Sequence, residues 1–526
     1  MSNGSFSFEH PFINHGNTNG AILMKPNTPY ISKLSLHLVK IDEDSLYMKR
    51  LTNKRTEVKW PKEINPRSYF VGCQWFEDYA TVAITSRDFQ TTWYLSCTYQ
   101  KPSGKCKILW TKDWTLTKGY SDILSAGFND GDKLITVTPS NSEKSTSQII
   151  MINTTNVNIH SLTTNCLFVM ELVRWDKVQE IVYYIASKIS KPDERHLYKS
   201  FFGNQSHLQV YCLTCDDNSD NPSKNERNRW PTCHYSSVTF SPKGSYYLLD
   251  CLDDKGDLKN LPETFIVSTK SNMIVLTLDN RQIEEDNYKK VFYDVPKFKF
   301  FQCPIADGKY NARIKLQLPP NFTSDKKYSL IVGVDSRIGS QQVNRKWKID
   351  VGTYASIEKE YIYAVADVRG SGYQGYEFES ELYNNIGNPE VDDLLEVLHW
   401  MLNKLPYIDS DNVFVQGEQY GGMVAILIAL KEPNLIKAIA IYHPPLFWNG
   451  TSAFFAERLL GLPTLDDNYF GYKAKSIGEN VNRYRDMKIL IVMDMSTNSG
   501  GHSQQISMMR DKINNESYHF EFLNVI

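Results

Sequence analysis

Residues 417–422, Gly-Glu-Gln-Tyr-Gly-Gly, have the spacing of a catalytic turn but lack its reactive side chain. In the motif Gly-x-Ser-x-Gly, a serine lies on a sharp turn between a strand and a helix, and the glycines leave room for the crowded backbone. Gln419 occupies the position of that serine. A glutamine amide has no hydroxyl that a base could deprotonate, so Gln419 cannot form an acyl-enzyme in this way. The motif therefore predicts a hydrolase turn without its nucleophile.

The sequence on either side of this turn has the expected order of elements. Residues 412–416 form a short apolar run typical of a strand, and residues 423–430 have the composition of a buried helix. An ordinary turn of an α/β protein would also explain the glycines when they are taken alone. The rest of the chain decides between these two interpretations.

The pattern of elements changes once along the chain. From the N-terminus to about residue 285, short alternating strands follow one another at close spacing, as in residues 128–137 and 238–249, with turn residues between them. This pattern is typical of a β-propeller or a β-sandwich, although the sequence has no clean repeat period. The first expected domain is therefore residues 1–285.

Residues 286–526 alternate apolar strands with amphipathic helices. This alternation predicts a doubly wound α/β domain with the 417–422 turn near its centre. The expected buried strands are 328–334, 361–366, 438–442 and 489–492, and one helix face carries Val391, Leu394, Leu395, Leu398, Leu402 and Leu405.

Composition excludes some classes of function. A chain of 526 residues has room for two large domains. The net charge is −2 and the Lys and Arg residues are scattered, so no nucleic-acid surface is expected. The sequence has no apolar run of about 18 residues that would span a membrane. Residues 1–5 lack the basic and apolar parts of a signal peptide.

Six of the nine cysteines have a nearby partner. The expected disulfides are Cys97–Cys106, Cys212–Cys215 and Cys233–Cys251, and they would form in an oxidising compartment. The alternatives are reduced, half-buried thiols or a zinc site made by Cys212, Cys215 and Cys233. Zinc is disfavoured because neither a second Cys-x-x-Cys nor a histidine pair completes a tetrahedral set.

Glycosylation sequons lead to the same compartment as the cysteines. The pattern Asn-x-Ser/Thr begins at Asn3, Asn153, Asn204, Asn321, Asn449 and Asn515. The candidate glycosylation sites are Asn153, Asn204 and Asn321. Together with the cysteines, these sequons favour an extracellular or cell-surface origin.

Four further motifs connect this chain to a known family. They are residues 367–375 (Asp-Val-Arg-Gly-Ser-Gly-Tyr-Gln-Gly), 387–393 (Gly-Asn-Pro-Glu-Val-Asp-Asp), 457–464 (Glu-Arg-Leu-Leu-Gly-Leu-Pro-Thr) and 502–505 (His-Ser-Gln-Gln). With these motifs and the β-rich region in their order, the chain resembles the dipeptidyl peptidase IV family of the prolyl oligopeptidase clan, from about Pro26 to the C-terminus. The resemblance implies an incomplete N-terminal β-propeller and a truncated α/β-hydrolase domain. The family consists of serine peptidases that remove dipeptides after proline or alanine.

The resemblance also implies that no catalytic position is intact. Gln419 stands at the nucleophile, and Asn498 stands at the triad aspartate, where an amide cannot stabilise an imidazolium. The family's histidine follows the next strand, and we expect this chain to end within that strand. Asp335 matches the tyrosine that helps to form the oxyanion hole, and its carboxylate would repel an oxyanion. His443 and His502 have no activated serine beside them in the sequence.

Part of a binding site is expected to persist. Tyr420, Trp448 and Phe455 match aromatic positions that hold the proline ring in the family, although packing in the core would explain the three residues equally well. The family's glutamate pair, which binds the substrate amine, would precede this chain, and residues 284–286 are better explained as a solvated acidic linker. An open propeller of four or five blades would leave edges that invite a partner.

These observations lead to one main hypothesis and two rivals. The main hypothesis is a catalytically inactive relative of dipeptidyl peptidase IV with a binding or accessory role. It would have a protein or peptide partner at the propeller face, a homodimer by resemblance, and neither a cofactor nor a metal. The first rival is a serine dipeptidyl peptidase of which this chain is a fragment or variant. The second rival is a hydrolase that uses a nonstandard nucleophile.

Overall fold

The structure is a computed structural model of the chain. It describes residues 4–7, 37–40, 55–57, 61–65, 68–98, 106–114, 126–140, 146–164, 166–203, 208–215, 232–259, 261–278, 294–334, 337–484, 487–494, 505, 507–509, 511–512 and 520–525.

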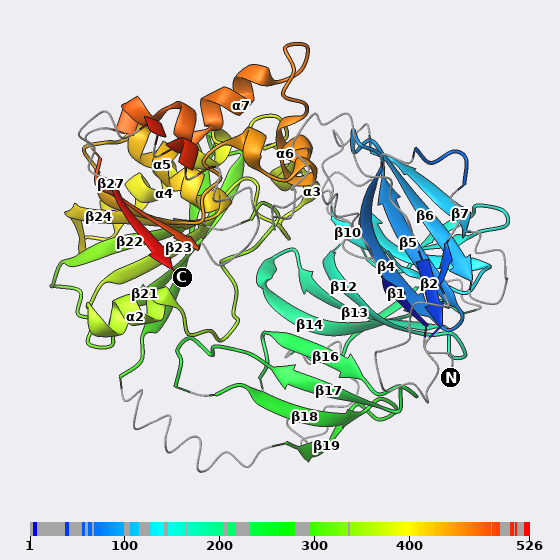
Figure 1. Cartoon of the computed structure of the whole chain (residues 1–526). Coiled ribbons are helices and arrows are strands. Elements are labelled where there is room, and N and C mark those ends of the chain that lie inside the picture. Colours follow the sequence, from blue (N-terminus) through cyan, green and yellow to red (C-terminus); the bar gives the residue numbers. More distant parts are fainter. Residues whose placement is uncertain are drawn as a thin grey trace.

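Antiparallel sheets made of consecutive strands build the N-terminal region. A three-stranded sheet (β1–β3) is followed by four sheets of four strands each (β4–β7, β8–β11, β12–β15 and β16–β19). Figure 1 shows these sheets following one another around an arc, from blue β4–β7 to green β16–β19. Sheets that pair only strands adjacent in sequence and that succeed one another in this way are the blades of a propeller.

The strands have the following bounds. They are β1 Gly4–Ser7, β2 His37–Lys40, β3 Arg55–Glu57, β4 Tyr69–Phe76, β5 Tyr79–Thr85, β6 Thr91–Thr98, β7 Cys106–Asp113, β8 Phe128–Asn129, β9 Lys133–Pro139, β10 Ser147–Asn153, β11 Ile159–Ser161, β12 Leu167–Asp176, β13 Ile181–Lys188, β14 Lys191–Phe201, β15 Gln209–Cys212, β16 Ser236–Phe240, β17 Tyr246–Cys251, β18 Glu263–Ser268 and β19 Met273–Thr277.

Alternation of side chains places alternate residues of a strand in the core that it shares with a neighbouring blade. In β17, Tyr247, Leu249 and Cys251 are buried, and they pack with Ile181 and Tyr183 of β13 in the preceding sheet. Successive side chains of a strand point to opposite faces, which explains this period of two. Blade packing therefore follows from the same alternation that the sequence displays.

All three expected disulfides are confirmed. Cys97–Cys106 joins β6 to β7, and Cys212–Cys215 closes the end of β15. Cys233–Cys251 ties the segment before β16 to the end of β17. All six cysteines are buried in the cores of the blades, so each bond links segments that also pack there.

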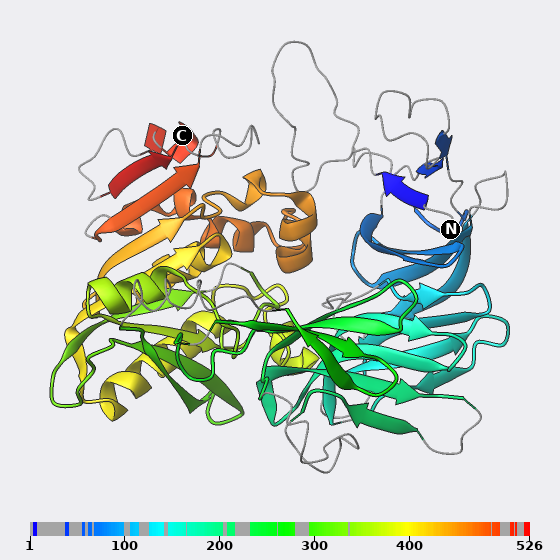
Figure 2. The ribbon, with the colours of Figure 1, turned by 90° about the horizontal axis from the view of Figure 1, so that it is seen from below.

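The C-terminal domain is built on one eight-stranded sheet. Its order is β20-β21-β23-β22-β24-β25-β26-β27, in which β20 and β21 are antiparallel and the strands from β23 onward are parallel. Helix α5 packs on β24 and β25, and α4 packs on α5. In Figure 2 this sheet and its helices, from green-yellow to red, lie on the opposite side of the molecule from the first blades.

The elements of this domain have the following bounds. They are β20 Lys297–Ile305, β21 Tyr310–Leu318, β22 Tyr328–Val334, α2 Val351–Glu358, β23 Ile362–Asp367, α3 Tyr376–Ser380, α4 Pro389–Lys404, β24 Ile408–Glu418, α5 Tyr420–Lys431, β25 Ile436–Tyr442, η3 Trp448–Gly450, α6 Ala453–Leu460, α7 Tyr469–Lys475, η4 Ile477–Glu479, η5 Val481–Tyr484, β26 Ile489–Asp494 and β27 Phe520–Val525.

The predicted fold class, a propeller joined to an α/β-hydrolase domain, is confirmed. The hairpin β20–β21, which adds an antiparallel edge to the sheet, is absent from the predicted doubly wound pattern. The strand expected at 412–416 is longer in both directions, because β24 begins at Ile408 and continues into the turn at Glu418. The expected boundary at 285/286 lies outside the described residues, between β19 and β20.

One part of the contact between the two domains joins residues 252–254, which follow β17, to Lys315 of β21 and residues 345–347. We call it the hinge side. The backbone N–H of Trp347 donates to Leu252 O at 2.7 Å, and that of Asp254 donates to Arg345 O at 2.8 Å. Lys315 Nζ lies 2.7 Å from Asp254 Oδ2, and the side chains are 8% and 0% exposed. Burial lowers the pKa of Lys315 and raises that of Asp254, and their mutual attraction opposes both shifts.

Removing one partner of this ion pair is expected to destabilise the chain. In Lys315→Met the Asp254 carboxyl remains buried without its cation, which should lower the free energy of unfolding by about 3–5 kcal/mol. The measurement is the shift of the urea midpoint. Lys326→Met is the matched control, because Lys326 and Glu360 are both half exposed, and little change is expected there. Equal shifts in the two variants would contradict the prediction.

Candidate functional site

The turn that carries Gln419 keeps the backbone of a nucleophile elbow. β24 ends at Glu418, and α5 begins at Tyr420, so Gln419 alone makes the connection. Its φ of 48° and ψ of −116° are a conformation that side-chain-bearing residues rarely adopt. The Gln419 N–H donates to Tyr442 O at 2.7 Å, and the residue is exposed. The strained turn therefore displays an amide where a hydrolase displays its hydroxyl.

Two glycines make this turn sterically possible. A Cβ on Gly417 would lie 2.1 Å from Gly421 O, far inside contact distance. A Cβ on Gly422 would lie 3.0 Å from the Cβ of Pro444, which follows β25. Strand, turn and helix can thus approach one another only with glycine at these positions.

The three aromatic residues predicted for binding do lie together. The Trp448 ring stacks on Phe455 at 5.7 Å between centroids and meets Tyr420 edge-on at 6.5 Å. Trp448 is 0% and Tyr420 5% exposed, whereas Phe455 is only half-buried. Two of the rings are thus core residues of the domain, and Phe455 offers more of its surface.

Tyr420 also binds a buried acid that the sequence analysis assigned no role. The Tyr420 hydroxyl and the Gly387 N–H both donate to Glu390 Oε1. Glu390 is 3% exposed, and its Oε2 has no hydrogen-bond partner among the described residues. Burial raises the pKa of Glu390, and these two hydrogen bonds oppose the shift. The sequence showed three carboxylates near the start of α4, namely Glu390, Asp392 and Asp393, and did not single out Glu390.

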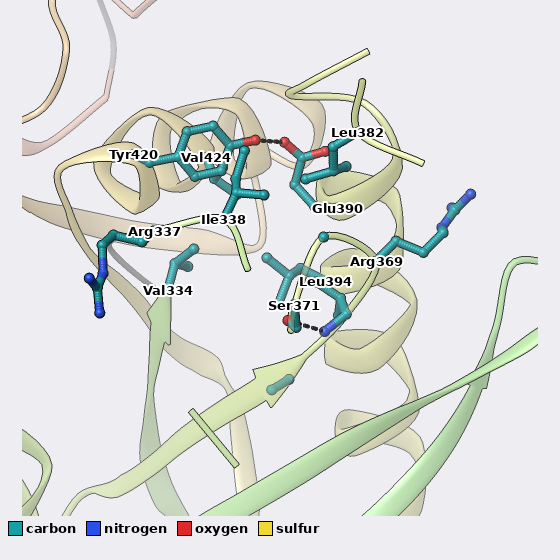
Figure 3. A pocket seen from close by; sticks show the side chains of 13 residues that line it. Val334, Arg337, Ile338, Arg369, Ser371, Leu382, Glu390, Leu394, Tyr420 and Val424 are labelled. Atoms are coloured by element: carbon teal, nitrogen blue, oxygen red, sulfur yellow. Dashed lines mark hydrogen bonds between the residues drawn. The ribbon is translucent and has the colours of Figure 1, made fainter. Parts of the chain in front are cut away.

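A small cavity lies beneath this pair (Figure 3), at the carboxyl ends of β22 and β23. It encloses about 40 Å³ and is walled by Val334, Ile338, Leu394 and Val424, with Glu390 above them. Arg337 and Arg369 point away from its centre, and Arg369 forms an ion pair with Asp393 at 2.6 Å. A cavity of this size holds one or a few waters.

The remaining predicted catalytic positions lie outside the described residues. These are Asp335, Asn498 and His502. His443 follows β25 directly, beside the residue that accepts the Gln419 N–H, and its φ is 48°. Ser371 is a loop hydroxyl whose oxygen accepts from the Val368 N–H at 3.1 Å. Neither residue is placed as a nucleophile by the described contacts.

The candidate glycosylation sites differ in their surroundings. Asn321 is exposed, whereas Asn153 is half-buried and its side-chain oxygen accepts from the Thr155 N–H at 2.9 Å. Asn204 lies outside the described residues. Glycosylation at these positions stays a prediction.

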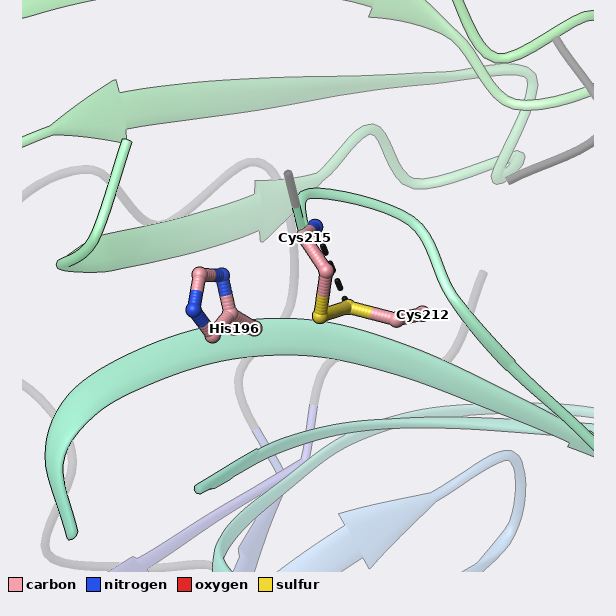
Figure 4. Close-up of side chains that lie close together, drawn as sticks. All are labelled: His196, Cys212 and Cys215. Carbon is pink, nitrogen blue, oxygen red and sulfur yellow. Dashed lines mark hydrogen bonds between the residues drawn. A yellow bond between two sulfur atoms is a disulfide. The ribbon is translucent and has the colours of Figure 1, made fainter. Parts of the chain in front are cut away.

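The structure gives the alternative zinc site a different set of residues. The ligand atoms of His196, Cys212 and Cys215 lie within 4.8 Å of one another (Figure 4). Cys233 is instead bonded to Cys251. In this structure both Cys212 and Cys215 are in a disulfide, and only thiolates bind zinc. His196 uses its ring nitrogens for Glu194, at 3.1 Å, and for Thr214, at 3.3 Å. The cluster as described is a disulfide packed beside a buried histidine.

The fold and the elbow together define an α/β-hydrolase domain joined to a propeller. Residues 347–507 match the model of the prolyl oligopeptidase family, and residues 31–256 match that of the dipeptidyl peptidase IV N-terminal region. These matches support the dipeptidyl peptidase IV family for this chain.

Individual relatives carry differing names. The chain is 27% identical to venom dipeptidyl peptidase 4 of Apis mellifera over 68% of its own length and 44% of that protein. It is 25% identical to inactive dipeptidyl peptidase 10 of Rattus norvegicus, over 65% and 40%. The matched part thus spans less than half of these curated relatives. A solved Porphyromonas gingivalis dipeptidyl peptidase 4 has the same fold, with a TM-score of 0.74 at 18% identity over 95% of this chain and 64% of that one.

Relief of the elbow strain provides a test of its geometry. Gln419→Gly should raise the free energy of unfolding by about 1 kcal/mol, because glycine adopts a positive φ without a steric penalty. Gln416→Gly, three residues earlier in β24, should instead lower it by about 0.5–1 kcal/mol. Thermal and urea unfolding measure both. Destabilisation by both glycines would show that the turn is unstrained.

The raised pKa of Glu390 predicts the sign of a pH effect. The stability that this acid contributes is complete below its ordinary pKa and is lost as the pH rises towards its folded-state pKa. Gln imitates the neutral acid, so Glu390→Gln should match the parent near pH 4. At pH 7 the free energy of unfolding of Glu390→Gln should be higher than that of the parent, because the parent must then keep or lose a proton at a buried acid.

A second variant with the opposite sign controls for general effects of pH. A hydrogen bond from Lys309 lowers the pKa of Glu381, so Glu381→Gln should lose stability relative to the parent as the pH rises. Urea titrations at both pH values compare the two. If Glu390→Gln instead loses stability relative to the parent towards pH 7, the pKa of Glu390 is not raised by burial.

Proposed function

We propose that this chain is a catalytically inactive dipeptidyl peptidase IV-like protein that binds a peptide or protein segment at the elbow. The observation that carries the proposal is Gln419, exposed on the strained turn where the chemistry needs a serine. An amide side chain donates and accepts one hydrogen bond each to a peptide unit without attacking it. With glutamine at this position, the elbow can bind a peptide but cannot cleave it.

The surface beside Gln419 suits such a ligand. Phe455 presents a half-buried ring that Trp448 holds by stacking, and Tyr420 is fixed by its bond to Glu390. Pre-oriented aromatic rings bind an apolar residue such as proline at a low cost in conformational entropy. We expect the peptide backbone at Gln419 and an apolar side chain at Phe455.

The rival function is a serine dipeptidyl peptidase of which this chain is a fragment or variant. Relatives named as dipeptidyl peptidase 4 favour it, as does the 44% share of the venom relative that is matched. An extracellular location and a homodimer are further expectations from the resemblance. Among the described residues, no helix combines the length and apolar character of a membrane span.

Activity and binding assays separate these functions. The purified chain should neither cleave a Gly-Pro anilide nor react with a fluorophosphonate probe, because Gln419 has no hydroxyl to acylate. It should bind a Gly-Pro-containing peptide, and Gln419→Ala should weaken that binding about 5- to 10-fold, the value of one or two hydrogen bonds. Isothermal titration calorimetry measures the affinity.

Two controls complete this experiment. Gln416→Ala, in β24 three residues before Gln419, should bind as the parent does. Gln419→Ser should remain inactive, since Asn498 stands at the position of the family's aspartate. Turnover by the parent chain that disappears in Gln419→Ala would overturn the proposal.

A further inference from the structure

A second contact joins the two domains away from the hinge side, and it centres on Glu457 of α6. The Tyr69 hydroxyl and Arg87 Nε each donate to Glu457 Oε2 at 2.8 Å, and Arg87 Nη2 donates to Oε1 at 2.5 Å. Tyr69 begins β4, and Arg87 lies in the turn after β5. Both carboxylate oxygens are therefore bound by groups of the first four-stranded blade.

Aromatic rings enclose this ionic contact. Tyr69 stacks on Phe89 at 5.3 Å, and Phe454 of α6 meets their rings edge-on at 5.2 Å and 5.5 Å. Glu457 is 3% exposed. Burial raises the pKa of Tyr69, and Glu457 raises it further, so the phenol keeps the proton that it donates. A bidentate arginine held among rings is a strong and geometrically specific contact.

The same helix carries part of the proposed binding site. Phe454 and Glu457 face the blade, while Phe455 between them stacks on Trp448. Figure 1 places α6 on the side of the hydrolase domain that faces the propeller. Movement of α6 away from the blade would therefore shift the ring that lies nearest the solvent in the aromatic trio.

The hinge side and the Glu457 contact are two of the places where the domains meet, and they differ in kind. Phe168 of β12 also packs on Tyr373 and Tyr376. The hinge side includes backbone hydrogen bonds, such as Trp347 N–H to Leu252 O, and the buried ion pair of Lys315 with Asp254. The contacts described around Glu457 are made by side chains. Desolvation of a carboxylate and a guanidinium offsets much of their attraction, so moving both partners into water costs less than leaving one of them buried alone. The Glu457 contact is therefore suited to open while the hinge side remains closed.

We propose that Glu457, Arg87 and Tyr69 form a latch between the domains, and that it positions α6 and admits the ligand to the Gln419 site. Glu457 acts through Phe455 and is a positioning residue. The part that concerns ligand affinity rests on the proposed peptide binding. The part that concerns the distance between the domains does not.

The distance between the domains can be measured without any ligand. Spin labels at Val178→Cys, 95% exposed on the propeller, and at Leu465→Cys, 77% exposed on the hydrolase domain, report it in a Cys166→Ser background. Glu457→Gln and Arg87→Met should shift the distribution to longer distances. Glu381→Gln, at the half-buried partner of Lys309, should not. Unchanged distances in both latch variants would overturn the proposal.

Hydrogen exchange and a charge swap separate opening from unfolding. In the latch variants, amides of α6 should exchange about tenfold faster, while residues 341–347 on the hinge side keep their protection. Arg87→Glu combined with Glu457→Arg should restore both the distance and the protection. Failure of the swap to restore either of them would show that the pair acts only through local packing.

Ligand binding then tests the positioning role. The Gly-Pro-containing peptide should bind at least about fivefold more weakly to Glu457→Gln than to the parent, and the charge swap should recover that loss. Opened domains with unchanged affinity would overturn the positioning of the ligand site by the latch. If the parent chain binds no peptide, the proposed function fails, and the distance measurement still decides on the latch.

Discussion

The close approach of β24 to α5 at the elbow is the constraint on which the rest of the C-terminal domain depends. Gly417 and Gly421 touch through backbone atoms, so the chain must reverse within Gln419 alone. That requirement fixes a positive φ whatever side chain the residue carries. Steric packing therefore preserves the backbone of a catalytic turn independently of the hydroxyl that the chemistry needs, and loss of the serine leaves the fold intact.

The packing behind the turn also sets the charge state of the interior. Tyr420 follows the elbow directly, so its ring must lie under α4, where Glu390 accepts its hydroxyl. An acid so deeply buried keeps its proton more readily than one in water, and the neutral form leaves the helix pair without a net buried charge. The cavity beneath it remains lined mainly by aliphatic side chains.

Sequence reasoning succeeded where partners are close along the chain and failed where they are distant. The three disulfides join cysteines separated by 9, 3 and 18 residues, within one blade edge each. The elbow is likewise a local signal. Glu457 and Arg87 lie 370 positions apart, and no periodicity relates them. Family positions named Tyr420, Trp448 and Phe455, whose rings do contact one another, while their binding role stays a prediction. Only the three-dimensional packing distinguished the buried rings from the half-buried one.

Two of the interdomain ion pairs, Lys315–Asp254 and Arg87–Glu457, differ in their surroundings. Lys315 and Asp254 lie among backbone hydrogen bonds that already hold the domains together. Their buried ion pair therefore makes the relative position of the two domains more specific at this contact. Arg87 and Glu457 meet where the described contacts are made by side chains. Tyr69, Phe89 and Phe454 pack beside this pair, in which Glu457 is buried and Arg87 is 25% exposed. An ion pair whose strength depends on dryness weakens sharply once water enters, because the effective dielectric rises as soon as the rings part. In the proposed latch, opening of this contact would move α6 and, with it, the Phe455 ring that stacks on Trp448.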